Sequence, residues 1–441
     1  MSRISYTRRQ VCQLGLSSLA GLTMLDLAAC GSSPSTGSSP NISMQLSFWG
    51  DASRNKLTQA AIKAFQKDSH PNTHFSTWFA DFSSYFTKLN TQIAGGTSPD
   101  LIQMDMSYVK QYADDKQILD LTALTANKTI DVSDFDESLL TNSKYNNVLY
   151  GIPLGSNYEC LIYDTALIKE AGVDAPPTTW TWDDYASYAS KISKALSAKG
   201  IFGSHDASGA MDVFEIWVRQ NGHDVYTADG KAGFTLDDVQ TWFEYWSALR
   251  KSGACATAQI QATVTGSGPS AQLLAKGKSA FASGHSNQFS GYQKLTKDTL
   301  ALQLIPLDAG KQPGNYQKPS MLMSIAPNSK NTDEAAKFIN FITTQPDGVK
   351  AIGIDRGIPG SKRGLAALTP TLKAVDQATI TYSATVTTNN QSRPKTVLDP
   401  SAAGKVLTNL GTVSQAVAFG RLTPAAAASQ FLQNTQKTLA G

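Results

Sequence analysis

Residues 145–185 read YNNVLYGIPLGSNYECLIYDTALIKEAGVDAPPTTWTWDDY, and the interpretation of the whole chain starts from this stretch. Val148 to Tyr150 and Cys160 to Tyr163 are short apolar segments typical of β-strands. Pro153 has no amide hydrogen for a sheet ladder, which predicts that a central strand ends there. Leu154 to Tyr158 is then a polar crossing between two strands, and we expect it to be a hinge between two lobes.

Length and composition set the class of protein. The chain has 441 residues, which is too long for one ordinary hydrophobic core and predicts two or more lobes. Hydrophobic residues make up 41% and charged residues 17%, as in soluble globular proteins, and the formal net charge is only +3. No basic stripe with interleaved aromatic residues is present, so we expect no nucleic-acid partner.

An export signal is predicted at the N-terminus. A cationic start and an apolar segment precede the sequence LAAC, which ends at Cys30 and resembles a bacterial lipobox. We expect residues 1–29 to be removed as a signal peptide, Cys30 to carry the lipid, and residues 30–43 to form a Ser/Gly/Pro linker. A transmembrane anchor is disfavoured because Asp26 would lie in hydrocarbon. The pair Arg8-Arg9 also fits twin-arginine export, and the export route stays open.

Cys160 and Cys255 are the two cysteines that follow Cys30. An exported compartment permits a disulfide between them. Cys160, however, lies in an apolar strand, where a free cysteine behaves as a small buried hydrophobe, so we expect two unpaired thiols. No cluster of His, Cys and carboxylate residues has metal-ligand spacing, and we predict neither a metal nor a cofactor.

Strand and helix patterns alternate near the start of the mature chain. We expect strands at Met44–Trp49, His74–Phe79 and Leu101–Met104. Helices are expected between them, at Asn55–Gln66 and Tyr85–Ile93. This βαβ order predicts a parallel sheet with helices on its faces.

The second half repeats this style with more helix. Apolar residues at helical spacing predict helices at Trp182–Leu196, Met211–Asn221 and Leu236–Ser252. From Gly364 the chain is predicted to be helical to its end, interrupted by one extended piece at Ile380–Thr388.

A family resemblance rests on several segments that follow one another over nearly the whole mature chain. They are Tyr85–Asp100, Tyr150–Asp164, Pro177–Tyr185, Asn221–Phe234, Gly277–Phe281, Asn328–Phe341 and Gly357–Pro359. Behind a lipobox, this set resembles extracellular solute-binding protein family 1, the substrate-binding lipoproteins of carbohydrate ABC importers, in the branch that includes maltose-binding protein.

The resemblance implies an α/β protein with the periplasmic-binding-protein type II fold. Its two α/β lobes have mixed sheets, are joined by a hinge, and hold the ligand in a cleft between them. Lobe one would comprise residues 44–156 plus 318–360, and lobe two residues 157–317 plus 361–441. The first crossing between the lobes would lie at Gly155 to Tyr158.

The function implied is capture of a sugar or oligosaccharide and its delivery to the transmembrane subunits of an ABC permease. The protein would act as a monomer, anchored to the outer face of the cell membrane through Cys30. The sugar, its linkage, its chain length and the permease stay open.

Two alternatives are an exported carbohydrate-active hydrolase and a binding protein for a polyol or glycerol phosphate. Asp183-Asp184 and Asp114-Asp115 are adjacent, so on a helix their carboxylates diverge by roughly 100° and cannot serve one bond. The sequence also has no Gly-x-Ser-x-Gly elbow and no His-Glu-x-x-His helix, and we predict that the protein is not an enzyme.

Candidate ligand contacts in lobe one lie where strands end, because such positions face a cleft between lobes. Aromatic rings cover the flat faces of a sugar, and polar side chains bind its hydroxyl groups. The candidates are Trp49, Asp51, Asp81 and Asp105. Core packing is the alternative for Trp49, and helix capping is the alternative for Asp81 and Asp105.

The other candidates lie near the crossings and in lobe two. Matching of charge to a helix dipole is the alternative for those at a helix start, and a surface salt bridge is the alternative for the arginine. The family often has a stacking tryptophan near Asn287 that this chain lacks, so the stacking surface comes from elsewhere or the ligand is smaller or more polar. The candidates are Asn157, Tyr158, Asp212, Glu215, His285, Asn287, Tyr316 and Arg356.

Overall fold

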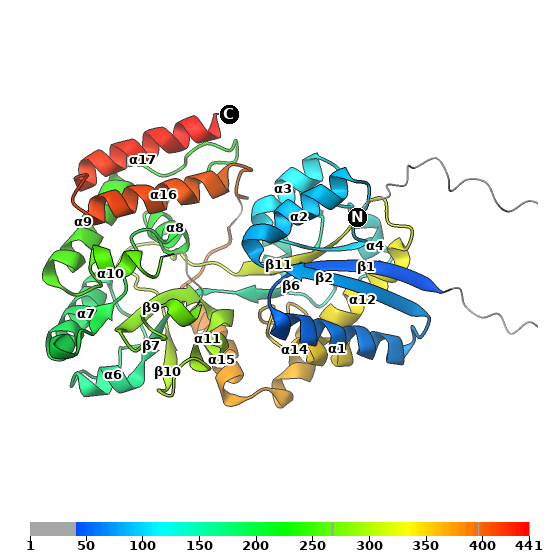
Figure 1. The fold of residues 1–441 in the computed structure, drawn as a ribbon, viewed down its shortest axis with the longest axis horizontal. Coiled ribbons are helices and arrows are strands. Elements are labelled where there is room, and N and C mark those ends of the chain that lie inside the picture. The colour runs from blue at the N-terminus through cyan, green and yellow to red at the C-terminus, as the bar shows by residue number, and fades with distance from the viewer. Residues whose placement is uncertain (1–40, 266–268, 396, 441) are drawn as a thin grey trace, which may run out of the picture. The chain divides into compact units, whose positions relative to one another are not determined.

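The computed structural model describes residues 41–265, 269–395 and 397–440. They form two α/β lobes, one built on a five-stranded sheet and one on a four-stranded sheet (Figure 1). The predicted signal peptide and Cys30 lie outside the described residues. No helix within the described residues combines the length and the hydropathy needed to cross a bilayer.

The five-stranded sheet of the first lobe has the order β2-β1-β3-β11-β6. The strands β1 (Ile42–Trp49), β2 (Thr73–Ala80) and β3 (Leu101–Met104) are parallel, as the βαβ pattern predicts. β11 (Lys318–Ile325) and β6 (Ile152–Asn157) add antiparallel pairs, which makes the sheet mixed. β1 begins earlier than the predicted Met44.

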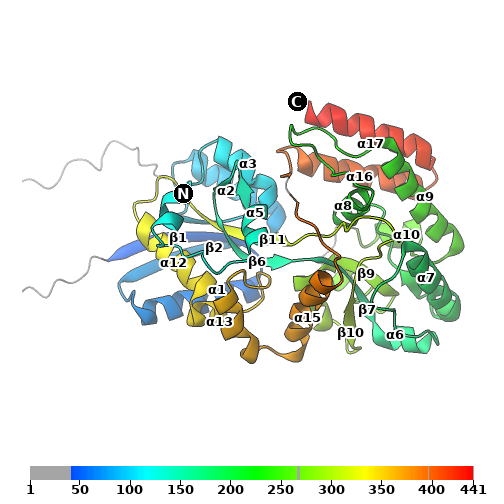
Figure 2. The ribbon, with the colours of Figure 1, turned by 180° about the vertical axis from the view of Figure 1, so that it is seen from behind.

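Helices cover both faces of this sheet. α2 (Phe82–Ala94) and α3 (Met106–Asp114) lie on one face, and α1 (Ala52–Asp68) lies on the other (Figures 1 and 2). Because both faces are covered, β3 is buried at every position. α2 and α3 each begin where a strand ends, so the helix starts lie at one edge of the sheet.

The four-stranded sheet of the second lobe has the order β10-β7-β9-β8. β7 (Glu159–Asp164) pairs antiparallel with β10 (Leu300–Gln303) and β9 (Ser279–His285), whereas β8 (Phe202–Ser204) is parallel to β9. This sheet is therefore mixed as well.

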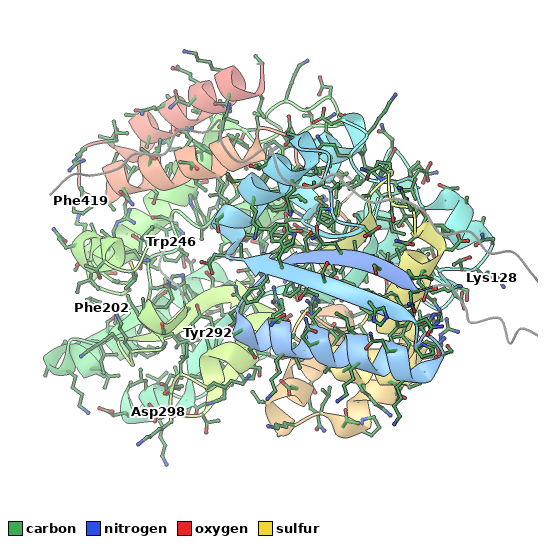
Figure 3. The ribbon with its side chains drawn as sticks, turned by 45° about the vertical axis from the view of Figure 1, so that its right-hand side comes forward. Lys128, Phe202, Trp246, Tyr292, Asp298 and Phe419 are labelled. Atoms are coloured by element: carbon green, nitrogen blue, oxygen red, sulfur yellow. The ribbon has the colours of Figure 1, made fainter. Side chains whose placement is uncertain are left out.

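Helices of the second lobe surround an aromatic core. α7 (Trp182–Leu196) and α9 (Leu236–Ser252) have the predicted bounds, and α8 (Met211–Gln220) ends one residue earlier than predicted. Trp242 and Trp246 on α9 are fully buried, and Figure 3 shows Trp246 among these helices. α16 (Ala403–Ala418) and α17 (Pro424–Leu439) pack against α9.

The remaining elements are short or cap the two sheets. They are α4 (Thr122–Ala126), α5 (Glu137–Asn142), β4 (Lys144–Tyr145), β5 (Val148–Leu149), α6 (Thr165–Glu170), η1 (Ser197–Lys199), α10 (Ala258–Ala262), η2 (Pro269–Ala271), η3 (Ser286–Gln288), α11 (Phe289–Gln293), α12 (Thr332–Thr344), α13 (Pro346–Ile352), α14 (Lys362–Leu368), η4 (Thr369–Thr371) and α15 (Ala374–Thr388).

The prediction that a strand ends at Pro153 is wrong. β6 runs through this proline to Asn157. β6 is the outermost strand of its sheet, so it needs ladder hydrogen bonds along one side only, and its register with β11 shifts nearby. A proline is tolerated in such an edge position.

The predicted extended piece at Ile380–Thr388 is also wrong, because these residues belong to helix α15. The segment is rich in β-branched residues, which favour strands when taken alone. Thr379, Tyr382 and Val386 are buried at helical spacing, with Tyr382 and Val386 in the core below the four-stranded sheet. Packing of this face overrides the local preference.

The crossing between the lobes is very short. β6 ends at Asn157 and β7 begins at Glu159, so Tyr158 alone separates strands of different sheets. A second segment lies beside it, since the amide of Ser156 donates to the carbonyl of Ile358 at 2.8 Å. Gly155 permits this approach, because a Cβ there would lie 2.5 Å from the carbonyl oxygen of Arg356. The residue bounds of the two lobes stay a prediction.

Candidate functional site: a charged cavity between the lobes

A cavity of about 450 Å³, called here the charged cavity, is lined from both lobes. This volume falls within the range of small-molecule sites. Helix starts, strand ends and the connection before α16 supply its walls. The lining residues are Phe82, Asp105, Ser107, Tyr108, Met211, Asp212, Glu215, Val225, Tyr226, His285, Lys318, Asp399, Ser401, Ala403, Gly404 and Leu407.

The first lobe contributes aromatic rings, one carboxylate and the ammonium of Lys318 on β11. Asp105 follows β3 and caps α3, accepting hydrogen bonds from the amide of Ser107 at 2.9 Å and from its hydroxyl at 2.7 Å. Phe82 opens α2 and is 45% exposed. The ring of Tyr108 stacks on the ring of Phe86 with 3.7 Å between the ring centres, and this contact fixes the orientation of Tyr108. Phe82 and Tyr108, with Tyr226 from the second lobe, are aromatic residues that line this cavity.

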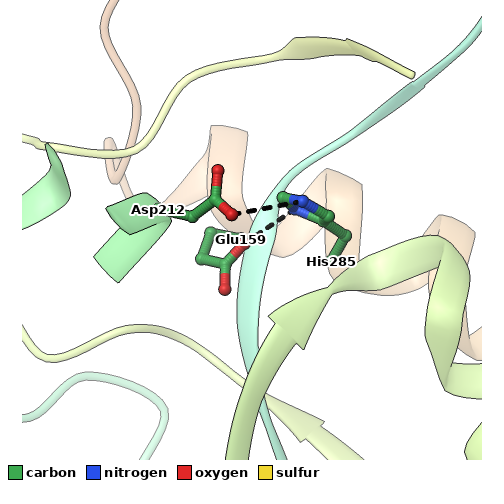
Figure 4. A group of neighbouring side chains, drawn as sticks. All are labelled: Glu159, Asp212 and His285. Carbon is green, nitrogen blue, oxygen red and sulfur yellow. Dashed lines mark ion pairs between the residues drawn. The ribbon is translucent and has the colours of Figure 1, made fainter. Parts of the chain in front are cut away.

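Glu159, His285 and Asp212 of the second lobe form a chain of charged groups (Figure 4), which continues to Lys318 on β11 of the first-lobe sheet. Nδ1 of His285 lies 2.7 Å from Oε2 of Glu159, and its Nε2 lies 3.6 Å from Oδ2 of Asp212. Nζ of Lys318 donates to Oδ1 of Asp212 at 2.8 Å. In the spatial order Glu159, His285, Asp212 and Lys318, negative and positive groups therefore alternate.

This chain of charges shifts the pKa values of Asp212 and His285. Burial would raise the pKa of Asp212, but the nearby Lys318 and His285 hold it well below its ordinary value. Burial would lower the pKa of His285, but the carboxylates of Glu159 and Asp212 raise it above its ordinary value. The surroundings thus favour the ionised form of Asp212 and the protonated form of His285.

Glu159, Asp212 and His285 also form a group that could hold a metal ion, with one ligand atom from each residue within 4.8 Å of the others. They lie far apart in the sequence, so ligand spacing could not reveal them. Lys318 already supplies positive charge to Asp212. The arrangement therefore matches an ion-pair network, and we propose no metal.

Lys395, on the connection between α15 and α16, lies beside the charged cavity and lines a small adjoining one. Its ammonium lies 2.7 Å from Oε1 of Glu215 and 2.7 Å from Oδ1 of Asp399, and 5.2 Å from the ring centre of Tyr316. Burial would lower the pKa of Lys395, but Asp399 and Glu215 raise it well above its ordinary value. Sequence analysis missed Lys395 and Asp399, because no motif marks the connection that carries them.

Several predicted contacts thus converge on this site. Asp105, Asp212, Glu215 and His285 line the charged cavity. Tyr316 lines a small adjoining cavity of about 30 Å³, which also includes Asp105.

The other predicted residues of the first lobe have structural surroundings. Trp49 is 9% exposed and packs against Phe82 and other rings of the lobe core. Asp51 caps α1 by accepting the amide of Arg54 at 3.0 Å, and Asp81 holds the corresponding position before α2. None of these three predicted residues lines the charged cavity.

Arg356 is buried in the first lobe and is not a surface salt bridge. Its Nε donates to Gln103 at 3.0 Å, and its Nη2 donates to Thr58 at 2.8 Å. Burial, together with the charge of Arg54, lowers the pKa of Arg356 to about 9. With 2% of its surface exposed, it makes no contact with the charged cavity.

The predicted residues at the crossing and after β9 also lie outside the charged cavity. Asn157 is 4% exposed, and its Oδ1 has no hydrogen-bond partner in the described chain. Tyr158 is 6% exposed and packs in the core below the four-stranded sheet. Asn287 lies in η3 and also has a buried Oδ1 without a partner among the described residues.

A second cavity of about 640 Å³, called here the wide cavity, lies on the other side of the connection before α16. Turns from both lobes line it: Tyr145 to Asn147 from the first and Thr227 to Gly230 from the second. Leu398 and Pro400 line the wide cavity, whereas Asp399 between them lines the charged cavity. The connection therefore borders both.

A further cavity of about 230 Å³ lies within the second lobe, where His205, Gly209 and Ser414 are among its lining residues. It draws residues from one lobe only. Movement of the lobes would therefore not enclose a ligand there, and we take the charged cavity as the candidate site.

Cys160 and Cys255 are both free and buried, as predicted. The thiol of Cys160 donates to the carbonyl of Gly284 at 2.9 Å. Burial raises the pKa of both thiols well above the ordinary value, so both stay protonated and unreactive.

Comparison with known families gives a direct assignment. Residues 51–348 match the family model described as bacterial extracellular solute-binding protein. The chain belongs to this family. As a solute-binding protein it is a member of a family of binding proteins, and its mixed α/β lobes agree with the fold that the resemblance implied.

Solved structures support the same assignment. An extracellular solute-binding protein family 1 member from Alicyclobacillus acidocaldarius subsp. acidocaldarius DSM 446 is 32% identical, covers 92% of this chain and 100% of its own, and has a TM-score of 0.73. A periplasmic oligogalacturonide-binding protein from Yersinia enterocolitica is 21% identical, covers 90% of this chain and 99% of its own, and has a TM-score of 0.78. The second likeness concerns the fold alone.

Curated relatives match over a shorter part. The erythritol/L-threitol-binding protein of Mycolicibacterium smegmatis is 24% identical over 212 residues, which are 41% of this chain and 43% of that protein. The chain spans about half the length, or less, of the curated relatives it matches.

Proposed function

We propose that this solute-binding protein captures a polyhydroxylated solute, such as a sugar, an oligosaccharide or a polyol, in the charged cavity between its lobes. The observation that carries the proposal is the composition of this cavity, which combines aromatic rings with fixed carboxylates and draws residues from both lobes. Aromatic rings pack on the apolar faces of such a solute, and carboxylates accept its hydroxyl groups.

Each wall has its own role in this proposal. Phe82 and Tyr108 of the first lobe stack on the solute. Asp212 and Glu215 stand in the first turns of α8 and accept hydroxyl groups from the opposite side. Their orientation is set by Lys318 and Lys395, so little ordering is needed on binding.

Closure of the lobes follows because the proposed solute contacts lie on both lobes. A solute that touches both walls binds the closed form more tightly than the open form and shifts the equilibrium by that difference in affinity. Tyr158, the single residue between β6 and β7, and the paired segment at Ile358 are the proposed hinge. The closed form then docks on an ABC permease.

The names of similar proteins agree with this solute class. Oligogalacturonide and erythritol or threitol, which two of them are named for, are both polyhydroxylated. Their identity to this chain is low, so they support the class and not a particular solute.

A panel of sugars, oligosaccharides and polyols tests the proposal by thermal shift. A solute that binds only the folded protein raises the melting temperature, by an amount that grows with its concentration. We expect at least one member to do so, with a matching affinity by calorimetry. If no carbohydrate or polyol at millimolar concentration shifts the melting temperature, the proposal is overturned.

We also propose that Cys30 carries the lipid that anchors the protein to the outer face of the cell membrane. Replacing Cys30 by Ala is expected to move the protein from the membrane fraction to the soluble exported fraction. Retention of this variant in the membrane fraction would contradict the anchor.

A further inference from the structure

We propose that the solute carries a protonated amino group, as in an amino sugar or an amino polyol. This inference rests on the proposed function and makes its solute class narrower. It comes from the charge balance of the charged cavity, from the way the protein already holds its own ammonium groups beside it, and from one carboxylate, Asp105, that makes no direct ion pair among the described residues.

Carboxylates outnumber cations at the site. Asp105, Asp212, Glu215 and Asp399 line the charged cavity, and Glu159 stands behind His285. The cations are Lys318 and Lys395, and His285 adds a third when its imidazole is protonated. The excess of negative charge favours a cationic solute over a neutral one and disfavours an anionic one.

The protein provides its own example of how this site holds an ammonium group. Nζ of Lys395 lies between Glu215 and Asp399, 2.7 Å from an oxygen of each, and faces the ring of Tyr316. Two carboxylates and an aromatic ring are a favourable environment for a primary ammonium. The same kinds of group remain free for a solute on the opposite wall.

Asp105 is the group on that wall. Both of its hydrogen bonds come from Ser107 and end on Oδ1. Among the described residues, Oδ2 accepts no hydrogen bond and Asp105 makes no ion pair within 4 Å, although its charge acts on Lys318 of β11. The rings of Phe82 and Tyr108 line the same cavity, so an ammonium bound to Asp105 would also lie near aromatic faces.

A uronic acid, whose carboxylate is negatively charged, would be disfavoured in the charged cavity. Recognition of a carboxylate is best served by arginine, whose guanidinium binds it in a bidentate manner. No arginine is among the described residues that line the charged cavity, and Arg356 is buried in the first lobe. A solute carboxylate would therefore add to the negative charge without a matching partner.

Matched sugars measure this preference. The panel contains, for each neutral monosaccharide, its 2-amino, 2-N-acetylamino and uronic acid counterparts, at a pH where the amine is protonated. We expect the amino form to bind about tenfold tighter than the neutral form, in line with one charge-assisted hydrogen bond. The N-acetyl form, which has no charge, is expected to lose this gain, and the uronic form to bind more weakly than the neutral form.

Asp105→Asn assigns the effect to one side chain. This variant keeps an acceptor oxygen for Ser107 but removes the charge. It is expected to weaken binding of the amino form about tenfold and to weaken binding of the neutral form by a smaller factor. Asp81→Asn is the matched control, since Asp81 holds the same position at the start of α2 and does not line the cavity. Asp81→Asn is expected to change neither the affinity for the amino form nor the affinity for the neutral form.

The outcomes separate this inference from the proposed function. If neutral sugars bind and their amino counterparts bind no tighter, the amino solute is overturned while capture of a carbohydrate stands. Unchanged binding of the amino form by Asp105→Asn would overturn the role of this carboxylate. If no member of the panel binds, both the inference and the proposed function are overturned.

Discussion

The charged cavity and the wide cavity share one border, the connection that carries Leu398, Asp399 and Pro400, but they differ in how their polar groups are held. In and beside the charged cavity, ion pairs connect side chains from separate elements, as in Lys395 with Glu215 and Lys318 with Asp212. In the wide cavity, the ion pairs of Lys110 with Asp114 and of Asp229 with Lys231 join near neighbours in the sequence at the surface. Fixed polar groups are what selective recognition requires, so we place the solute in the charged cavity.

The largest expected difference between the cavities concerns stability. Lys395→Met would leave Glu215 and Asp399 without their cation in a buried site, which typically costs about 3–5 kcal/mol of the free energy of unfolding. Lys110→Met is the matched control, because its pair with Asp114 is exposed and typically contributes about 0.5 kcal/mol or less. Chemical denaturation measures both, and equal losses in the two variants would contradict the distinction.

The next effect concerns affinity. Phe82→Ala removes an exposed ring from the charged cavity and is expected to weaken binding of the solute about tenfold, since a stacked ring contributes about 1 kcal/mol beyond its buried area. Phe79→Ala is the control, because Phe79 is also partly exposed, at 38%, but lies outside the cavity. A loss of the same size in both variants, measured by calorimetry, would show that the effect is not local.

The pH dependence of stability separates two histidines. His285 has a pKa raised by Glu159 and Asp212 against the effect of burial, so its contribution is fully present below about pH 6.5 and is lost as the pH rises through the raised value. Burial lowers the pKa of His205 to about 4, so its contribution is present above about pH 6.5 and is lost as the pH falls towards 4.

Melting curves from pH 4 to 9 test these opposite signs. His285→Gln is expected to reduce the fall in melting temperature at alkaline pH and to leave the fall at acid pH unchanged. His205→Gln is expected to reduce the fall in melting temperature at acid pH only. A histidine variant that alters the other side would contradict the assignment of these groups.

The smallest effect is expected at Asn157. Its side chain is 4% exposed and lies outside the charged cavity, so Asn157→Ala should change solute affinity by about twofold or less. The sequence-based expectation of a ligand contact at this residue predicts a larger loss. Calorimetry on this variant and on Asp105→Asn decides between the two residues.

Much of the fold could be predicted because local signals agreed with packing. The strands of the βαβ unit and the bounds of α7 and α9 follow from apolar spacing and capping residues. The pair Asn146-Asn147 is typical of a turn, and both residues have positive φ between the short strands β4 and β5. Pro153 and α15 were mispredicted because an edge position and a buried face override local preferences.

Some residues of the site can be predicted from sequence pattern, whereas others come together only in the folded structure. Asp105 and Asp212 stand at helix starts next to strand ends or loops, which sequence pattern can locate. Glu159, Lys318 and Lys395 come together only through the tertiary fold, from two strands and a connection far apart in the chain. Arg356 was expected at the cleft because it precedes a family motif, but the fold buries it among Gln103 and Thr58.

The central claim is that one solute binds both lobes at the charged cavity and draws them together. Small-angle scattering on the purified protein, with and without a saturating solute from the panel, measures this directly. We predict a smaller radius of gyration on saturation for the unaltered protein and for Asp81→Asn. An unchanged radius at full occupancy, with the occupancy confirmed by calorimetry, would contradict closure around the charged cavity.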